Sequence, residues 1–115
     1  VRCWEALCDG LLDAAVLARL ESIRPDPATR SADWIARQTG KIDAALDAMA
    51  RGLGDKPYCA EGKYSLADVS MGCALGYLDF RFPQIDWRAR HPNLARHAAK
   101  LFARPAFVET APPTP

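Results

Sequence analysis

Residues 64–83 constrain the fold of this chain more than any other stretch. Ser65 and Asp68 stand three positions apart, directly before an apolar run, which is the capping-box pattern of a helix N-terminus. Up to residue 78 the only strongly polar side chains in that run are Asp68 and Ser70. A helix that is apolar on nearly all sides belongs in the middle of a bundle. We therefore predict a central helix that begins after Ser65 and ends near Arg81, and we interpret Ser65 and Asp68 as a structural capping box.

Proline residues and apolar periodicity divide the remainder of the chain into further helices. Pro25 and Pro27 break the chain because proline lacks an N–H donor, and Pro92 suits a first helical turn. The expected helices are 2–21, 32–51, 65–81 and 92–103, with a short turn from 105 and a frayed end at 111–115. No strand alternation, repeat or second-domain boundary is visible. The predicted fold class is all-α, an orthogonal bundle of about five helices forming a single domain over residues 1–115.

The expected first helix combines a wide apolar surface with a narrow acidic strip. Its apolar stripe and the flank that widens it are Trp4, Leu7, Leu11, Ala14, Ala15 and Ala18, then Leu12, Val16 and Leu20. Glu5, Asp9 and Asp13 recur every four residues, so their carboxylates share one helix face. A solvated strip explains these carboxylates as readily as a functional site does.

Gly72 and Gly76 lie four residues apart in the expected central helix. Glycine in a helix interior lowers helix stability by about 1 kcal/mol relative to alanine, so two glycines here need a structural explanation. We predict close approach of a neighbouring helix at these positions.

Charge and composition exclude several classes of protein. The 115 residues include 15 basic and 14 acidic side chains, for a formal net charge of +1, and they form no basic stripe that would bind nucleic acid. No apolar run approaches the roughly 20 residues of a membrane span. Neither a nucleic-acid nor a membrane partner is therefore expected.

The four cysteines and two histidines show no metal-ligand spacing. Cys3, Cys8, Cys59 and Cys73 contain no Cys-x-x-Cys pair, and three of them fall inside helical apolar patterns, where cysteine acts as a small hydrophobe. We interpret them as reduced, packed thiols of a cytoplasmic protein, although an even number leaves a disulfide possible. His91 and His97 are not on one helix face. We expect no metal site, no catalytic residue and no cofactor in this chain.

Several segments, taken in order, resemble the C-terminal helical domain of cytosolic glutathione S-transferases, in particular bacterial members. They are Lys56-Pro57-Tyr58, the run from Tyr64 to Leu75, Pro92-Asn93-Leu94 and Arg104-Pro105-Ala106-Phe107, with Ala6 to Ala15 resembling the first helix of that domain. The resemblance covers nearly the whole chain. Together with Val1 in place of an initiator methionine and a 50% content of hydrophobic residues, it suggests the C-terminal fragment of a two-domain protein.

The resemblance implies a role for this domain within a larger enzyme. In the family, an N-terminal thioredoxin-like domain, absent from this chain, binds glutathione as co-substrate and activates its thiol. The helical domain forms most of the hydrophobic site for a small apolar electrophile and part of a homodimer interface. Resemblance to the family's first helix implies that Asp9, Leu12 and Asp13 border that site. The pair Ser65 and Asp68 matches the family's structural capping box.

Two functions remain open from the sequence. The first is the co-substrate domain of a glutathione transferase, which is inactive by itself. The second is a transferase-like binding or assembly module without catalysis, because a fold does not determine a function.

Overall fold

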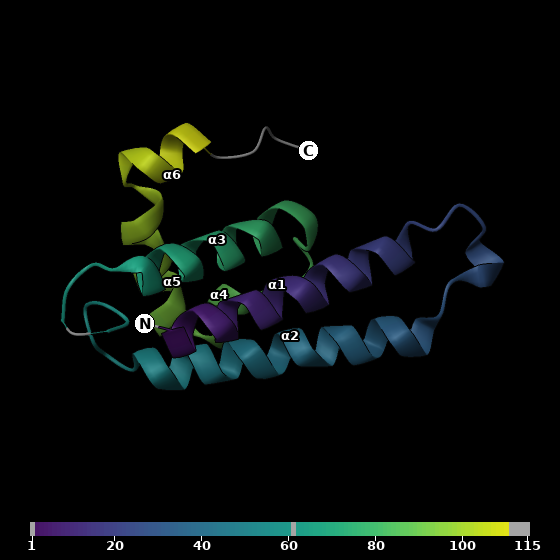
Figure 1. The fold of residues 1–115 in the computed structure, drawn as a ribbon, viewed down its shortest axis with the longest axis horizontal. Coiled ribbons are helices and arrows are strands. Elements are labelled where there is room, and N and C mark those ends of the chain that lie inside the picture. Colours follow the sequence, from purple (N-terminus) through teal and green to yellow (C-terminus); the bar gives the residue numbers. More distant parts are fainter. Residues whose placement is uncertain (1, 61, 111–115) are drawn as a thin grey trace.

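The computed structural model describes residues 2–60 and 62–110 and shows six α-helices (Figure 1). Two long helices, α1 (Arg2–Ser22) and α2 (Ala32–Leu53), lie side by side and run in opposite directions, joined by a loop that contains the short 3-10 helix η1 (Pro27–Thr29). The helices that follow are α3 (Leu66–Arg81), α4 (Trp87–Arg90), α5 (Pro92–Phe102) and α6 (Pro105–Thr110). The described residues contain no strand, only an isolated bridge between Ala60 and Lys63.

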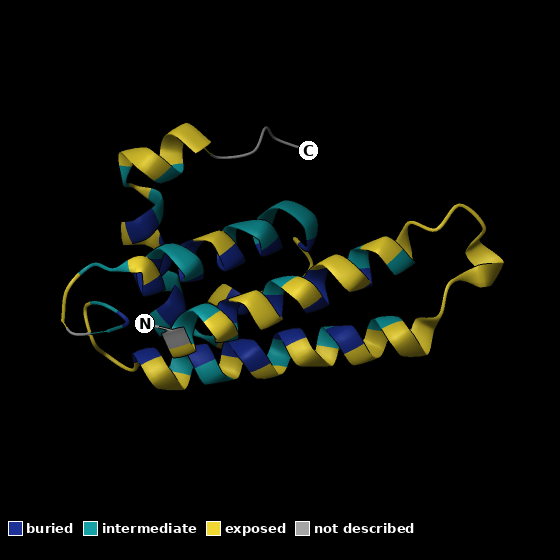
Figure 2. Cartoon of the chain, in the orientation of Figure 1, coloured by how far each residue is buried: buried dark blue, intermediate teal, exposed yellow. Residues whose placement is uncertain are grey.

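The hydrophobic core forms where α1, α2 and α3 meet and is closed by α4 and α5. Figure 2 shows buried positions all along α3, whereas α2 exposes a long outer face. The largest apolar side chains that are almost completely buried are Leu11, Ile42, Leu46, Met49, Leu53, Met71, Leu75, Leu78, Trp87, Leu94 and Leu101. The prediction of an all-α bundle with α3 near its centre is therefore confirmed.

Helix ends follow the local signals in the sequence. Ser65 and Asp68 form the predicted capping box at the start of α3, with the Ser65 N–H donating to Asp68 Oδ2 at 2.9 Å. The end of α2 is the positive-φ residue Gly54, at +55°, a conformation that glycine adopts without strain. The single-turn α4 adds to the expected count because Asp86 accepts a hydrogen bond from the Ala89 N–H. The expected frayed end at 111–115 lies outside the described residues.

The expectation for the cysteines holds in part. None of the four takes part in a disulfide, and Cys8 and Cys59 are buried as predicted. Cys3 on α1 and Cys73 on α3, in contrast, are exposed, so a place in an apolar helical run did not determine burial.

The predicted close approach occurs at Gly72 and is wrong for Gly76. A Cβ at Gly72 would lie 2.4 Å from Cζ of Phe107, the aromatic residue with which α6 packs against α3. The nearest atom to a Cβ at Gly76 is Cε1 of Phe102, at the ordinary contact distance of 3.9 Å. Gly72 is therefore required for the position of α6, whereas Gly76 leaves room for a methyl group.

We predict opposite effects of alanine at these two glycines. Gly72→Ala should displace Phe107, lower the thermal midpoint and accelerate amide hydrogen exchange in residues 105–110, because the ring and the methyl group cannot share the space. Gly76→Ala is the matched control and should stabilise the helix by up to about 1 kcal/mol. Equal exchange rates in 105–110 for the two variants would contradict the packing of Phe107 on Gly72.

Candidate functional site

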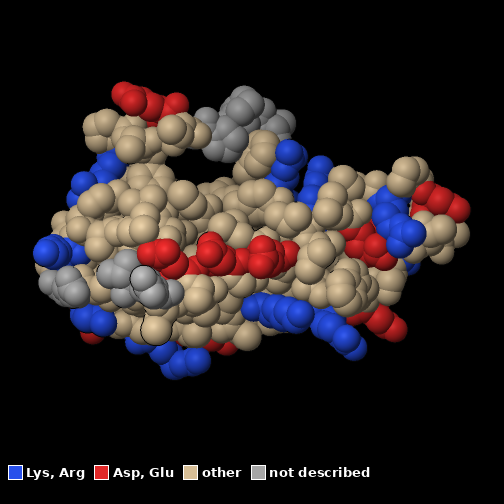
Figure 3. Space-filling view, in the orientation of Figure 1, with Lys and Arg blue, Asp and Glu red and all other residues tan. Residues whose placement is uncertain are grey.

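The residues predicted to border a substrate site lie on one accessible face of α1. Asp9 and Asp13 are exposed and Leu12 is half-buried. Figure 3 shows the row of acidic side chains over α1, to which Glu5 also belongs by its four-residue spacing. The structure thus makes both predicted carboxylates accessible, on the side of α1 that the bundle does not cover.

The same face becomes apolar toward the end of α1. Val16, Leu17 and Leu20 keep 40%, 42% and 56% of their surface exposed, although sequence periodicity placed Val16 and Leu20 on a buried flank. The expected burial is wrong at these positions because α2 and α3 cover only the stripe that contains Leu11. The accessible surface of α1 is therefore continuous, with acidic side chains in the first half of the helix and apolar side chains in the second.

A second group of polar side chains is hidden inside the bundle, around the Asp68 carboxylate. Asp68 Oδ1 accepts from the Cys59 N–H at 2.9 Å and lies 2.8 Å from His97 Nε2. The same nitrogen is 4.0 Å from Cys59 Sγ. All three residues are at most 2% exposed. The capping residue of α3 is therefore also the partner of α5 and of the loop before α3.

The surroundings of this cluster fix its protonation. Burial alone would raise the pKa of Asp68, but hydrogen bonds from the Cys59 N–H, the Cys59 thiol, His97 and the Ser65 N–H outweigh it and lower that pKa. Burial lowers the pKa of His97 despite the opposing effect of Asp68. Burial, with the hydrogen bond to Asp68, raises the pKa of the Cys59 thiol. At neutral pH the cluster holds a carboxylate, a neutral imidazole that donates through Nε2–H, and a protonated thiol.

This arrangement differs from a nucleophilic triad and from a metal centre. In a triad the imidazole uses one ring nitrogen for the nucleophile and the other for the carboxylate, whereas here Nε2 faces both Cys59 and Asp68. The three side chains bring potential ligand atoms within 4.8 Å of one another. Each oxygen of Asp68 already accepts hydrogen bonds, and the thiol retains its proton, so a metal would have to break this network. Its geometry is that of a structural network.

The other buried cysteine is also unsuited to nucleophilic chemistry. Burial raises the pKa of Cys8 to about 12, with Asp9 and Cys73 adding to the effect. A thiol that stays protonated at neutral pH is a poor nucleophile. This agrees with the interpretation of Cys8 as a packing residue.

No sequence motif pairs His97 with Asp68 and Cys59, and their meeting was not predicted. The spacing did offer one missed signal: Leu94, His97 and Leu101 recur at helical intervals, so His97 falls on the apolar stripe of α5. Its partner could not be read from the chain, because Asp68 lies 29 residues away and meets His97 only through the packing of α5 on α3.

Comparison with known proteins identifies the family. A family model described as the glutathione S-transferase C-terminal domain matches residues 32–100. The GST-like protein YibF of Escherichia coli K12 is 37% identical over 113 residues, which is 98% of this chain and 55% of the relative. A tetrachloro-p-hydroquinone reductive dehalogenase of Sphingobium chlorophenolicum is 31% identical over 80 residues, covering 70% of this chain and 32% of the relative.

Solved structures agree with this assignment. A glutathione S-transferase from Methylobacterium radiotolerans in complex with glutathione sulfonate superposes with a TM-score of 0.92 at 50% identity, over 96% of this chain and 52% of that one. One from Methylobacillus flagellatus KT with glutathione bound gives 0.93 at 42% identity, over 96% and 55%. The chain belongs to the glutathione S-transferase C-terminal domain family. It spans about half the length of these solved relatives and of YibF.

The structure revises the expected cost of removing Asp68. From the cap alone, Asp68→Ala would cost about 0.5–2 kcal/mol. The cluster adds two buried donors, the Cys59 N–H and His97 Nε2–H, each worth roughly 1–3 kcal/mol when left without an acceptor. We predict that Asp68→Ala lowers the free energy of unfolding by about 3 kcal/mol or more, measured by urea denaturation. Ser65→Ala, the control for the cap, should cost about 1 kcal/mol, and equal losses would contradict a wider role for Asp68.

Stability should also depend on pH through His97. The folded-state pKa of His97 is lowered, so below the ordinary value of about 6.5 the unfolded chain binds a proton that the folded chain does not. Stability from this residue is therefore present above about pH 6.5 and is lost as the pH falls further. In urea denaturation between pH 7.5 and 5.5, His97→Gln should flatten this decline. An unchanged slope in the variant would show that His97 is not its source.

Proposed function

We propose that this chain is the electrophile-binding half of a glutathione transferase. The observation that carries the proposal is the accessible face of α1, where exposed apolar side chains adjoin Asp9 and Asp13 on a domain of the transferase family. The glutathione sulfonate and the glutathione bound in two of the solved relatives support glutathione as the co-substrate. A thioredoxin-like domain would hold glutathione, and α1 would form the facing wall for a small apolar electrophile.

The chemistry proposed for this half is positioning and desolvation. Conjugation requires the acceptor carbon to be held near the sulfur of glutathione, and an apolar wall excludes water from the reacting atoms. Leu12, Val16 and Leu17 offer such a wall on α1. The buried thiols Cys8 and Cys59 keep raised pKa values, so no nucleophile is proposed from them.

The second candidate remains a binding or assembly module without catalysis. The favouring observation is that the Asp68 carboxylate and the Cys59 thiol are buried in the core, where they serve the fold. A homodimer and a cytoplasmic location are compatible with either role. Among the described residues, no helix is both long and apolar enough to cross a membrane.

Substitutions on α1 of the full-length protein test the electrophile site. Asp9→Asn and Asp13→Asn should each change KM for the electrophile by about threefold or more while changing KM for glutathione less, because the carboxylates border one substrate only. Asp43→Asn, an exposed carboxylate of α2 paired with Arg90, is the matched control and should leave both constants unchanged. Unchanged constants in all three variants would remove Asp9 and Asp13 from the site.

The division of labour between two domains gives a further expectation. The 115-residue chain alone should show no conjugation of glutathione to 1-chloro-2,4-dinitrobenzene above the uncatalysed rate. Thiol activation in this proposal belongs to the other domain, so measurable catalysis by the chain alone would overturn it. Catalysis by the full-length protein, in contrast, separates the enzyme from the assembly module.

A further inference from the structure

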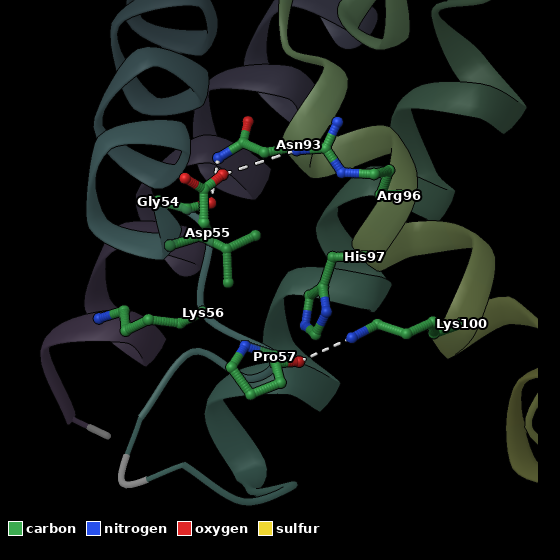
Figure 4. Close-up of a pocket in the computed structure, with 9 residues that line it drawn as sticks. Gly54, Asp55, Lys56, Pro57, Asn93, Arg96, His97 and Lys100 are labelled. Carbon is green, nitrogen blue, oxygen red and sulfur yellow. Dashed lines mark hydrogen bonds and ion pairs between the residues drawn. The ribbon is translucent and has the colours of Figure 1, made fainter.

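A pocket of about 370 Å³ lies at one end of the bundle, between α5 and the connection from α2 to α3 (Figure 4). Four residues of α5 line it and recur at helical spacing, so they share one face: Asn93, Arg96, His97 and Lys100. The other wall is formed by Leu53, Gly54, Asp55, Lys56 and Pro57. None of the α1 residues proposed for the electrophile site contributes to this lining.

The ionisable side chains around the pocket are mostly cationic. Lys56, Arg96 and Lys100 stand against the single carboxylate of Asp55. Arg96 lies 3.8 Å from Asp55, which is long for a salt bridge, and the Asp55 side chain is 99% exposed. Lys100 Nζ donates to the Pro57 carbonyl at 2.8 Å, across the pocket wall in Figure 4. The guanidinium and the ammonium can therefore turn to an anion without leaving a buried charge unpaired.

The ring of His97 adds a hydrogen-bond acceptor, Nδ1, to a pocket whose other ionisable side chains are mostly cationic donors. Its Nε2–H donates to the Asp68 carboxylate, so Nδ1 carries a lone pair and can only accept. Nδ1 is buried and has no hydrogen-bond partner among the described residues. Figure 4 shows this ring on the α5 side of the pocket, between Pro57 and Lys100. A ligand that satisfies the pocket must offer one donor to Nδ1 and several acceptors to the cations.

We propose that this pocket binds phosphate, as the free ion or as a phosphoryl group that still carries one proton. Its P–O–H would donate to His97 Nδ1, while its remaining oxygens accept from Arg96 and Lys100. Nδ1 is buried, so a ligand reaches it only if the side chains that cover it move, and Lys100 would exchange the Pro57 carbonyl for the ligand. Sulfate has the same shape and charge but no proton at pH 7, so it would face the Nδ1 lone pair with another acceptor. Selectivity for phosphate over sulfate is the signature of this site.

The test is a titration of the full-length protein at pH 7 and constant ionic strength, followed by calorimetry and by the ¹⁵N signals of the His97 imidazole. Inorganic phosphate should bind saturably and move the Nδ1 signal, and sulfate should bind at least about tenfold more weakly, the effect of one lost hydrogen bond to a charged group. Arg96→Gln and Lys100→Gln should each weaken phosphate binding by about tenfold. Arg37→Gln, an exposed arginine of α2 outside the pocket, is the matched control.

Each outcome decides the proposal without reference to conjugation. Equal affinity for phosphate and sulfate, or affinity unchanged in Arg96→Gln and Lys100→Gln, would overturn it. Glycerol phosphate distinguishes the two sources of the ligand, because a phosphomonoester loses its second proton near pH 6. Tighter binding of the monoester at pH 6 than at pH 8 would assign a phosphoryl group, and binding of inorganic phosphate alone would assign the free ion.

Discussion

Hydrogen bonds from separate parts of the chain converge on the Asp68 carboxylate. Ser65 supplies its backbone N–H and its hydroxyl from the start of α3, Cys59 its N–H from the preceding loop, and His97 its ring N–H from α5. An ionised carboxylate without these donors would be costly to bury. The same donors would be unsatisfied without the carboxylate. The start of the central helix, the loop before it and the position of α5 therefore form together.

The buried network around Asp68, which stabilises the fold, is separate from the face of α1 that is accessible to a ligand. The polar network is sealed in the interior, where its carboxylate and thiol are out of reach of a substrate. The face of α1 is supported from below by Leu11, Ala14 and Ala15, yet it keeps Asp13, Val16 and Leu20 accessible. This uncovered, partly apolar face of α1 is the feature on which the proposed electrophile site rests.

His97 belongs both to the buried network around Asp68 and to the lining of the pocket. One ring nitrogen belongs to the structural network around Asp68, and the other has no partner among the described residues and lies in a ring that lines the pocket beside Arg96 and Lys100. The carboxylate fixes the tautomer, so the fold itself determines that Nδ1 accepts. A phosphate in this pocket would thus donate a hydrogen bond to a His97 tautomer that Asp68, the capping residue of α3, determines.

Sequence patterns were sufficient where the determining interactions are local. The cap at Ser65 and the helix start at Pro92 both appear as predicted, because each depends on residues a few positions apart. Burial on the faces of helices depends on which neighbours arrive. Val16 and Cys73 accordingly belong to apolar patterns and are nevertheless exposed.

Contacts between distant segments were the part that the sequence could not supply. The meeting of Asp68 with His97 crosses 29 positions, and the contact of Phe107 with Gly72 joins α6 to α3. The first depends on how α5 packs against α3 and the second on how α6 does, and no local signal specifies either arrangement. The candidate residues on α1 were found by resemblance, and their accessibility came from the structure.

A double-mutant cycle between Asp68 and His97 tests the account most directly. Free energies of unfolding would be measured for the unmodified protein, Asp68→Asn, His97→Gln and the double variant at pH 7.5. If the buried network joins α3 to α5, the two substitutions should be coupled by about 1–3 kcal/mol. Additive losses within about 0.5 kcal/mol would contradict it and reduce Asp68 to a helix cap alone.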